Sequence, residues 1–236
     1  MKKVINLMKI IIATIKSWNI KNFFVLKNKF NEIDFFLIDN KEKLTKEYIK
    51  KINPDYLFFP HWSWKIPEEI YKNYKCIVFH MTDLPFGKGG SPLQNLIIKG
   101  IKQTKISAID VSKELDSGNI YIKKDLDISI GSAEEIFIKA SRIIFFEMIP
   151  YIIKNNPTPK KQVGKEVIFK RRKPNESNIL NQKKLDLEKL YDFIRMLDAK
   201  NYPLAFIKLE NLKIEFSEIH IKNNKLVGRF EVVEDE

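Results

Sequence analysis

One short stretch, residues 76–100 (CIVFHMTDLPFGKGGSPLQNLIIKG), restricts the fold more than any other part of the chain. Residues 76–79 form an apolar, β-favouring run of strand length, which predicts a buried strand with His80 at its carboxyl end. Residues 83–90 contain a proline and three glycines, so we expect them to continue neither a strand nor a helix. The local order is therefore strand, histidine and glycine-rich turn.

A helix is expected directly after this turn. Ser91 fits the N-cap position and Pro92 the first helical position. The apolar face of the predicted helix consists of Leu93, Leu96, Ile97 and Ile98. In an open α/β sheet, ligands bind beyond the carboxyl ends of the strands, where glycine lets backbone N–H groups approach a phosphate or an oxyanion. His80 and the glycines are therefore candidate site residues, although the pattern is also that of a histidine that merely ends a strand before a tight turn.

Similar units recur along the first 156 residues, where short apolar runs alternate with segments of helical spacing. Strands are expected at residues 8–14, 33–38, 56–59 and 106–111, with extended segments at 118–122 and 126–128. Helices are expected at 18–26 and 43–52, and a long one follows a capping box formed by Ser132 and Glu135. Its buried face should contain Ile136, Ile138, Ala140, Ile143, Ile144, Met148 and Ile152. This alternation predicts an α/β fold.

The last third of the chain has a different character. A basic, polar linker from residue 160 leads to a short strand at 166–169, a helix at 185–197 and β segments at 206–209, 213–216 and 226–230. We expect a catalytic domain over residues 8–156 and a small helix and β appendage over residues 157–236. The appendage leaves a homodimer open without requiring one.

Composition excludes several classes of protein. With 236 residues and 44% hydrophobic residues, the chain can bury a real core. The single cysteine, Cys76, excludes internal disulfides and thiol-ligated metal sites and favours a reducing, cytoplasmic setting. The net charge of +12 is spread along the whole chain, as expected of a solvated surface. The apolar run at residues 5–15 is too short and too interrupted to span a membrane, and residues 1–7 are an extension or a mis-assigned start.

Two motifs carry a family resemblance. The segment HMTDLPFGKGGSPLQ, from His80 onward, resembles the H-x-S-x-L-P-x-x-x-G-x-x-P loop of the folate-dependent formyltransferases. The downstream segment Leu115-Asp116-Ser117-Gly118 resembles that family's Leu-Asp-x-Gly turn, at a separation from His80 that is typical of the family. The resemblance implies a Rossmann-like fold with a mainly parallel sheet flanked by helices, and His80 and Asp116 as catalytic residues. The first strand lacks a glycine-rich turn, so no nicotinamide cofactor is implied.

One departure from the family concerns the tetrahedral oxygen of the reaction. The family places Asn two residues before the histidine, and this chain has Val78 there. His61, Thr82 and Asn95 are candidates to replace the missing amide, and the residues do not select among them. A non-catalytic relative that only binds folate or a nucleotide therefore stays open.

The resemblance also implies two substrates and no metal. The formyl donor would be N10-formyltetrahydrofolate, bound by Pro60, His61, Trp62, Ser63, Asp110, Val111 and Leu115. Trp62 and the neighbouring Trp64 can equally form an aromatic corner on the surface. We expect the acceptor to be a nucleotide-linked amino sugar, as in pseudaminic-acid-type pathways, and no nucleic-acid partner. Candidate acceptor ligands are Thr82, Asp83, Lys88, Gly89, Gly90, Ser91, Arg171 and Arg172, of which the cations can equally be solvated surface charges.

The alternative acceptor is the methionyl group of a charged tRNA. Methionyl-tRNA formyltransferases carry a C-terminal barrel, and only about eighty residues follow the long helix here. We therefore expect no room for that barrel, and the alternative is a shortened methionyl-tRNA formyltransferase.

Overall fold

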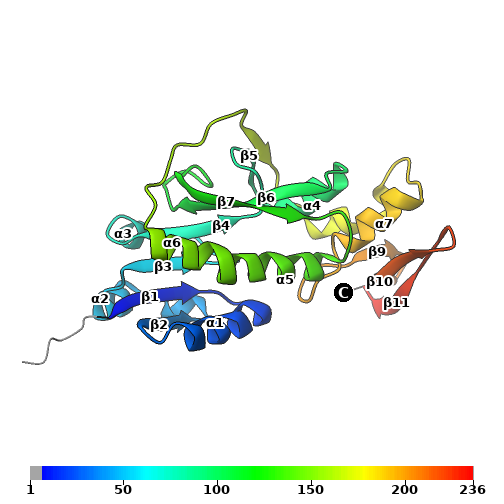
Figure 1. The fold of residues 1–236 in the computed structure, drawn as a ribbon. Coiled ribbons are helices and arrows are strands. Elements are labelled where there is room, and N and C mark those ends of the chain that lie inside the picture. The colour runs from blue at the N-terminus through cyan, green and yellow to red at the C-terminus, as the bar shows by residue number, and fades with distance from the viewer. Residues whose placement is uncertain (1–6, 236) are drawn as a thin grey trace, which may run out of the picture. The chain divides into compact units, whose positions relative to one another are not determined.

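The computed structural model describes residues 7–235 (Figure 1). The predicted extension over residues 1–7 therefore lies, apart from Leu7, outside the described residues. Contacts divide the chain into two units, which we call the sheet unit and the hairpin unit. The sheet unit comprises Met1–Lys88, Lys105–Lys124 and Ile138–Val167, and the hairpin unit comprises Gly89–Thr104, Asp125–Phe137 and Ile168–Glu236. The domain boundary at residue 156 stays a prediction.

A six-stranded sheet forms the core of the fold, in the order β2-β1-β3-β4-β6-β7. Its strands are β1 (Met8–Ala13), β2 (Ile33–Ile38), β3 (Tyr56–Phe59), β4 (Cys76–His80), β6 (Gln103–Asp110) and β7 (Ile120–Asp127). The first four pair in parallel, and β6 runs antiparallel to β4. This arrangement confirms the predicted α/β fold with a mainly parallel sheet.

One face of the sheet packs against short helices. Alternate residues of a strand point to opposite faces, so Ile11 and Phe59 share one face. They belong to a buried cluster with Ile49 and Ile70. The latter two lie in α2 (Lys46–Ile52) and α3 (Glu68–Tyr71). The helix predicted from residue 43 begins at Lys46, because Thr45 Oγ1 accepts a hydrogen bond from the Tyr48 amide and so caps it.

Three further helices belong to the other face, whose residues Ile10, Ile12 and Phe58 are fully buried. They are α1 (Ser17–Lys29), α5 (Ala133–Ile143) and α6 (Ile149–Asn155), with a π-helical turn (Ile144–Met148) between the last two. Asn22 of α1 donates to Ser141 Oγ of α5 at 2.8 Å, and Figure 1 shows α1 beside the long helical stretch. A mainly parallel sheet is thus covered on both faces, as its apolar strands require.

The long helix was predicted well at its start and less well along its face. Ser132 and Glu135 form the expected capping box, with Ser132 N–H donating to the carboxylate at 2.8 Å and Glu135 N–H donating to the hydroxyl at 3.2 Å. The prediction that Ile138 is buried is wrong, since the residue is 37% exposed. The π turn adds a residue to one turn of the helix, which a strict 3.6-residue period does not anticipate.

The glycine-rich segment differs from expectation in forming a short strand. β5 (Phe86–Gly89) pairs with β8 (Val167–Phe169), although proline and glycine predicted no regular structure here. Gly89 has a φ of +100°, and a Cβ on it would lie 2.4 Å from the Phe169 carbonyl oxygen. The glycine therefore permits a close backbone approach between two strands rather than only a turn.

The helix after the glycines, α4 (Pro92–Ile98), is present as predicted but is capped differently. Ser91 has a φ of +49° and makes no side-chain cap. Its hydroxyl instead accepts a hydrogen bond from the Arg172 amide at 3.1 Å. Ser91 therefore occupies the predicted N-cap position, with Pro92 first in the helix, but its side chain does not cap the helix. Ile98, which was expected on the apolar face, is 45% exposed.

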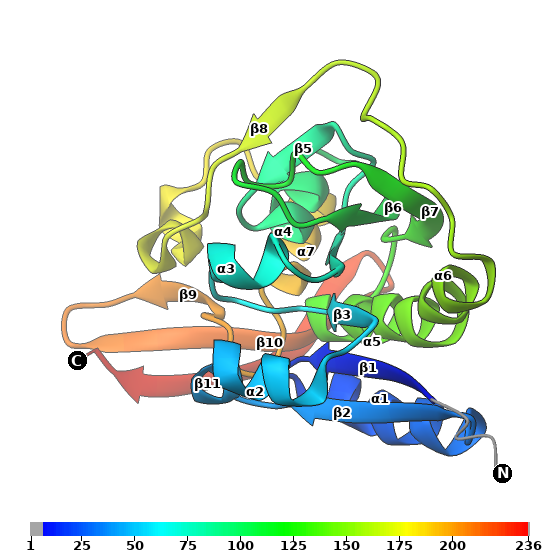
Figure 2. The same cartoon turned by 90° about the vertical axis from the view of Figure 1, so that its left-hand side faces the viewer.

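The hairpin unit carries α7 (Leu187–Arg195) and an antiparallel sheet of β9 (Ala205–Lys208), β10 (Leu212–Lys222) and β11 (Lys225–Glu234). Figure 2 shows these three strands side by side. They confirm the predicted β segments of the C-terminal third. Arg195 is buried and connects three backbone or side-chain groups, donating to Asp192, to the Gly131 carbonyl and to the Ile128 carbonyl.

Among residues 7–235, no helix has the length and apolar character needed to cross a membrane.

Candidate active site

The imidazole of His80 is placed by regular structure. His80 is the last residue of β4 and is 8% exposed. Its Nε2 lies 2.7 Å from the carbonyl oxygen of Gly87. A carbonyl oxygen only accepts hydrogen bonds, so Nε2 carries the proton in this contact. Gly87 has a φ of +79°, which lets the turn fold back over the end of the strand.

The carboxylate of Asp116 is placed by an irregular loop between β6 and β7. Asp116 has a φ of +53°, in the left-handed region that non-glycine residues rarely adopt. Two residues on, a Cβ on Gly118 would lie 1.9 Å from the carbonyl oxygen of Asp110. The glycine of the motif is therefore required by the close approach of the loop to the end of β6, where the Asp110 amide also donates to the Asn119 carbonyl at 2.9 Å.

His80 and Asp116 face one another. Nδ1 of His80 lies 3.6 Å from Oδ2 of Asp116, and the two side chains are 10% and 11% exposed. With Nε2 protonated toward Gly87, a second proton on Nδ1 makes the contact with the carboxylate attractive. A proton can therefore be held between the two side chains, which are largely shielded from solvent, and such a pair can act in general acid–base chemistry.

A buried lysine lies beside this pair. The side chain of Lys88 is 11% exposed, and its Nζ lies 3.1 Å from Ser117 Oγ and 2.6 Å from Glu166 Oε2. Ser117 is the residue after Asp116. An ammonium group in this position can bind an anionic part of a substrate, and the exposed carboxylate of Glu166 occupies it here.

Thr82 and Asp83, predicted acceptor ligands, hold the turn after β4. Thr82 is fully buried and donates to the Gly87 carbonyl at 3.3 Å. Asp83 forms ion pairs with Lys123 and Lys105. Partial burial acts to raise the pKa of Asp83, but the two ammonium groups outweigh it and hold the pKa below its usual value.

Three residues are candidates to replace the asparagine that the family resemblance places at Val78. Thr82 donates to the turn, as described. The amide of Asn95 donates to the carbonyls of Gly90 and Ser91 within the hairpin unit. His61, at the end of β3, is the neutral imidazole among them, because burial and the neighbouring charge of Lys16 lower its pKa to about 4.

The predicted folate-binding residues at the end of β3 form an aromatic corner. The rings of Trp62 and Trp64 are 5.0 Å apart, and Phe59 lies 6.1 Å from Trp62. Trp62 Nε1 is buried and has no hydrogen-bond partner within residues 7–235. Pro60 is buried and Ser63 is exposed. A buried indole N–H without an acceptor is what a polar ligand in this corner would satisfy.

The other predicted folate ligands lie elsewhere in the sheet unit. The register pairs His80 with Ser107 and Ile77 with Asp110, so Asp110 lies at the opposite end of β4 from His80. Burial raises the pKa of Asp110, whose carboxylate accepts a hydrogen bond from Tyr121 at 2.6 Å. The Val111 amide donates to the Cys76 carbonyl, and Leu115 is 72% exposed. The thiol of Cys76 is buried, and burial raises its pKa to about 12.

The remaining predicted acceptor ligands meet within the hairpin unit. A Cβ on Gly90 would lie 2.5 Å from Cβ of Arg171, so the two backbones are in close contact. The Arg172 guanidinium lies 5.7 Å from the ring centre of Phe193 and donates to the Glu176 carbonyl at 2.6 Å. Gly89 precedes this contact as the last residue of β5.

The sequence did not single out Gln162 or Glu166, which contact the Asp116 loop and Lys88 from the linker. The only sequence signal for these two residues is that both are polar and lie in or next to the basic, polar linker that begins at residue 160. Across the described residues 7–235, no three His, Cys, Asp or Glu side chains gather as a metal site.

Comparison with known proteins identifies the chain over most of its length. A family model described as Formyl transferase matches residues 23–143, and one described as Methionyl-tRNA formyltransferase, C-terminal domain, matches residues 174–233. The second match covers the segment in which we expected no room for a C-terminal domain. It thereby removes the length-based reason for preferring a sugar acceptor.

Three relatives illustrate the range of similarity. A solved structure named methionyl-tRNA formyltransferase from Clostridium thermocellum is 54% identical, with 97% of this chain and 100% of that chain covered and a TM-score of 0.93. Methionyl-tRNA formyltransferase of Bacillus subtilis is 28% identical over 184 residues, which are 74% of this chain but only 57% of the relative. A sugar N-formyltransferase from a Shewanella species is 15% identical, with 94% and 96% covered and a TM-score of 0.66, and so shares the fold.

The first family model covers more than half of the chain and contains both His80 and Asp116, and the Clostridium thermocellum relative matches from end to end. The chain therefore belongs to the formyl transferase family.

Proposed function

We propose that the protein transfers the formyl group of N10-formyltetrahydrofolate to the amine of methionine on its charged tRNA. The observation that carries this proposal is the buried His80–Asp116 pair, with 3.6 Å between Nδ1 and Oδ2, in a chain of the formyl transferase family.

The proposed reaction joins the amine nitrogen to the formyl carbon and breaks the bond between that carbon and N10. The amine loses one proton, and N10 gains one as it leaves. Asp116 accepts the proton from the amine, and the Nδ1–H of His80, on the side of the ring that faces Asp116, stabilises the negative oxygen of the tetrahedral intermediate. The pair then returns a proton to N10, so the enzyme ends in its starting state.

The aromatic corner at the end of β3 fits the pterin of the donor. Trp62 offers a buried N–H without a partner among the described residues, and a flat heterocycle with ring nitrogens and a carbonyl can accept it. Neutral His61 adds a second group that can donate or accept. The folate supplies the activated formyl carbon, and these residues would hold it.

Two observations support a tRNA acceptor over the nucleotide-linked amino sugar that we first expected. They are the match of residues 174–233 to the C-terminal domain model and the 54% identity to a relative bearing the methionyl-tRNA name. The sugar N-formyltransferase from Shewanella is 15% identical to this chain, and at that level of identity the likeness extends to the fold and not to the identity of the acceptor. The net charge of +12 also suits a polyanionic substrate.

The test is a competition between acceptors. The protein is incubated with N10-formyltetrahydrofolate and either methionyl-tRNA or a panel of UDP- and dTDP-linked amino sugars, and products are identified by mass spectrometry. We expect formylmethionyl-tRNA, with a KM that rises steeply with salt. Formylated sugar with unmodified tRNA would replace the acceptor, and ligand binding without any formyl product would identify a non-catalytic relative.

A further inference from the structure

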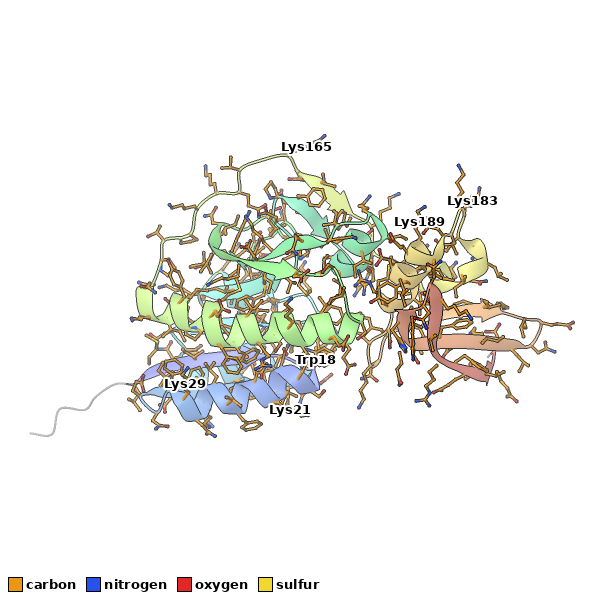
Figure 3. All side chains as sticks on the ribbon, turned by 45° about the vertical axis from the view of Figure 1, so that its right-hand side comes forward. Trp18, Lys21, Lys29, Lys165, Lys183 and Lys189 are labelled. Carbon is orange, nitrogen blue, oxygen red and sulfur yellow. The ribbon has the colours of Figure 1, made fainter. Side chains whose placement is uncertain are left out.

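The segment that runs from residue 157, after α6, to the first residue of β8, Val167, contacts both loops of the candidate site. Lys160 and Ile120 exchange two backbone hydrogen bonds of 2.7 and 2.9 Å, next to the Asp116 loop. Further on, the Val167 amide donates to the Pro85 carbonyl, in the turn that follows His80. Lys165 of the same segment points outward (Figure 3) and is exposed. We call this segment the strap.

Gln162 is the strap residue that reaches the Asp116 loop. Its Nε2 donates to the Asp116 carbonyl at 2.7 Å and to the Gly118 carbonyl at 2.9 Å. Its Oε1 is buried without a partner within residues 7–235. The opposite orientation of the amide would place an oxygen against two carbonyl oxygens, so both amide protons are committed to the loop.

The loop depends on contacts from outside itself. The left-handed backbone of Asp116, at a φ of +53°, is a conformation that non-glycine residues rarely adopt. Inside the loop, the Ser117 amide reaches the Glu114 carbonyl only at 3.4 Å. The two bonds from Gln162 are shorter, and they hold the carbonyls on both sides of Ser117.

We infer that Gln162 is a positioning residue that keeps the Asp116 carboxylate within reach of His80. By fixing the backbone at residues 116 and 118, it fixes the Cα from which the carboxylate extends. The inference rests on the proposed function for its effect on turnover, because Asp116 matters to rate only if the His80–Asp116 pair moves the proton.

The kinetic test compares Gln162→Met, which keeps the length and removes both donors, with Lys165→Met on the exposed side of the strap. We expect Gln162→Met to lower kcat about 10- to 100-fold, since a small misplacement of a reacting group has effects of this size. KM should stay within about twofold, and Lys165→Met should match the wild type in both constants.

A double-mutant cycle with Asp116→Asn separates positioning from general damage. If Gln162 acts through the carboxylate, adding Gln162→Met to Asp116→Asn should change kcat by less than about twofold. Additive losses, or a wild-type kcat in Gln162→Met alone, would overturn the inference.

A measurement without turnover keeps this inference distinct from the proposed function. Backbone hydrogen exchange of residues 116–119 should be faster in Gln162→Met than in the wild type or Lys165→Met, with β4 unchanged. Unchanged exchange in the loop would overturn the positioning role. Faster exchange in a protein that forms no formyl product would leave the positioning role standing and contradict only the proposed function.

Discussion

The two halves of the His80–Asp116 pair are held in different ways. His80 ends a strand whose neighbours on both sides are hydrogen-bonded, β3 in parallel and β6 antiparallel. Asp116 sits in a loop with a left-handed backbone, held by a glycine contact at Gly118 and by the side chain of Gln162. The comparison teaches that the imidazole depends on the whole sheet, whereas the carboxylate depends on a few individual contacts.

The largest effect is expected from removing either group while leaving its support intact. His80→Gln and Asp116→Asn should each lower kcat by about 10²- to 10⁴-fold, because each removes a group that we propose takes part in proton transfer. The affinity for folate, measured by titration calorimetry, should change little. A parallel loss of affinity and turnover in either variant would remove that residue from the chemistry.

The position of the Asp116 loop can be disturbed by a substitution at its glycine, Gly118. Gly118→Ala places a Cβ 1.9 Å from the Asp110 carbonyl oxygen, and this clash forces the loop to move. We expect kcat to fall about 10²-fold and urea unfolding to show a loss of about 1–3 kcal/mol.

Gly100→Ala is the matched control for this change. Gly100 also has a positive φ, +71°, but a Cβ there meets nothing within 4 Å. Its cost should be the backbone strain of about 1–2 kcal/mol with normal kcat. Equal kcat values in the two variants would show that the position of the loop does not matter to the reaction.

A smaller effect is expected where the loop meets Lys88. Glu166→Gln removes the exposed carboxylate that pairs with the buried ammonium, so a phosphate of the acceptor no longer competes with it. The KM for the acceptor should fall about threefold with kcat unchanged, the size expected for a solvent-exposed ion pair. Glu69→Gln, in a surface pair with Lys46, is the control. A higher KM in Glu166→Gln would mean that Glu166 supports binding instead.

The smallest effect is expected from His61, on the strand side of the comparison, and it concerns the pH dependence of folding stability. His61, at the end of β3, has a folded pKa of about 4 against an ordinary value of 6.5, so between these values the unfolded chain binds more protons. The contribution of neutral His61 to the free energy of unfolding should therefore be fully present above about pH 6.5. It should decrease as the pH drops toward 4 and change no further below that. Unfolding midpoints of the wild type and His61→Gln should converge in acid. A constant difference between them from pH 7 to 4 would contradict the shifted pKa.

The sequence predicted the sheet that holds His80 better than the individual contacts that hold Asp116. Apolar runs predicted the strands of the sheet, because a strand buried on both faces has little freedom in composition. Local patterns could not reveal that Gly89 lies against β8, or that the Ser91 hydroxyl accepts a hydrogen bond from Arg172 and not from α4. Nor could they reveal that the Gln162 amide donates to the Asp116 carbonyl. Each of these contacts joins segments far apart in the chain, and a single polar residue leaves no period.

The buried thiol of Cys76 has a practical consequence. Because burial raises its pKa to about 12 and shields the sulfur, the thiol should react only slowly with maleimide dyes at neutral pH. A cysteine introduced on the surface can thus be labelled selectively, and a fluorophore at an exposed strap position such as Lys165 would report changes in the surroundings of the strap.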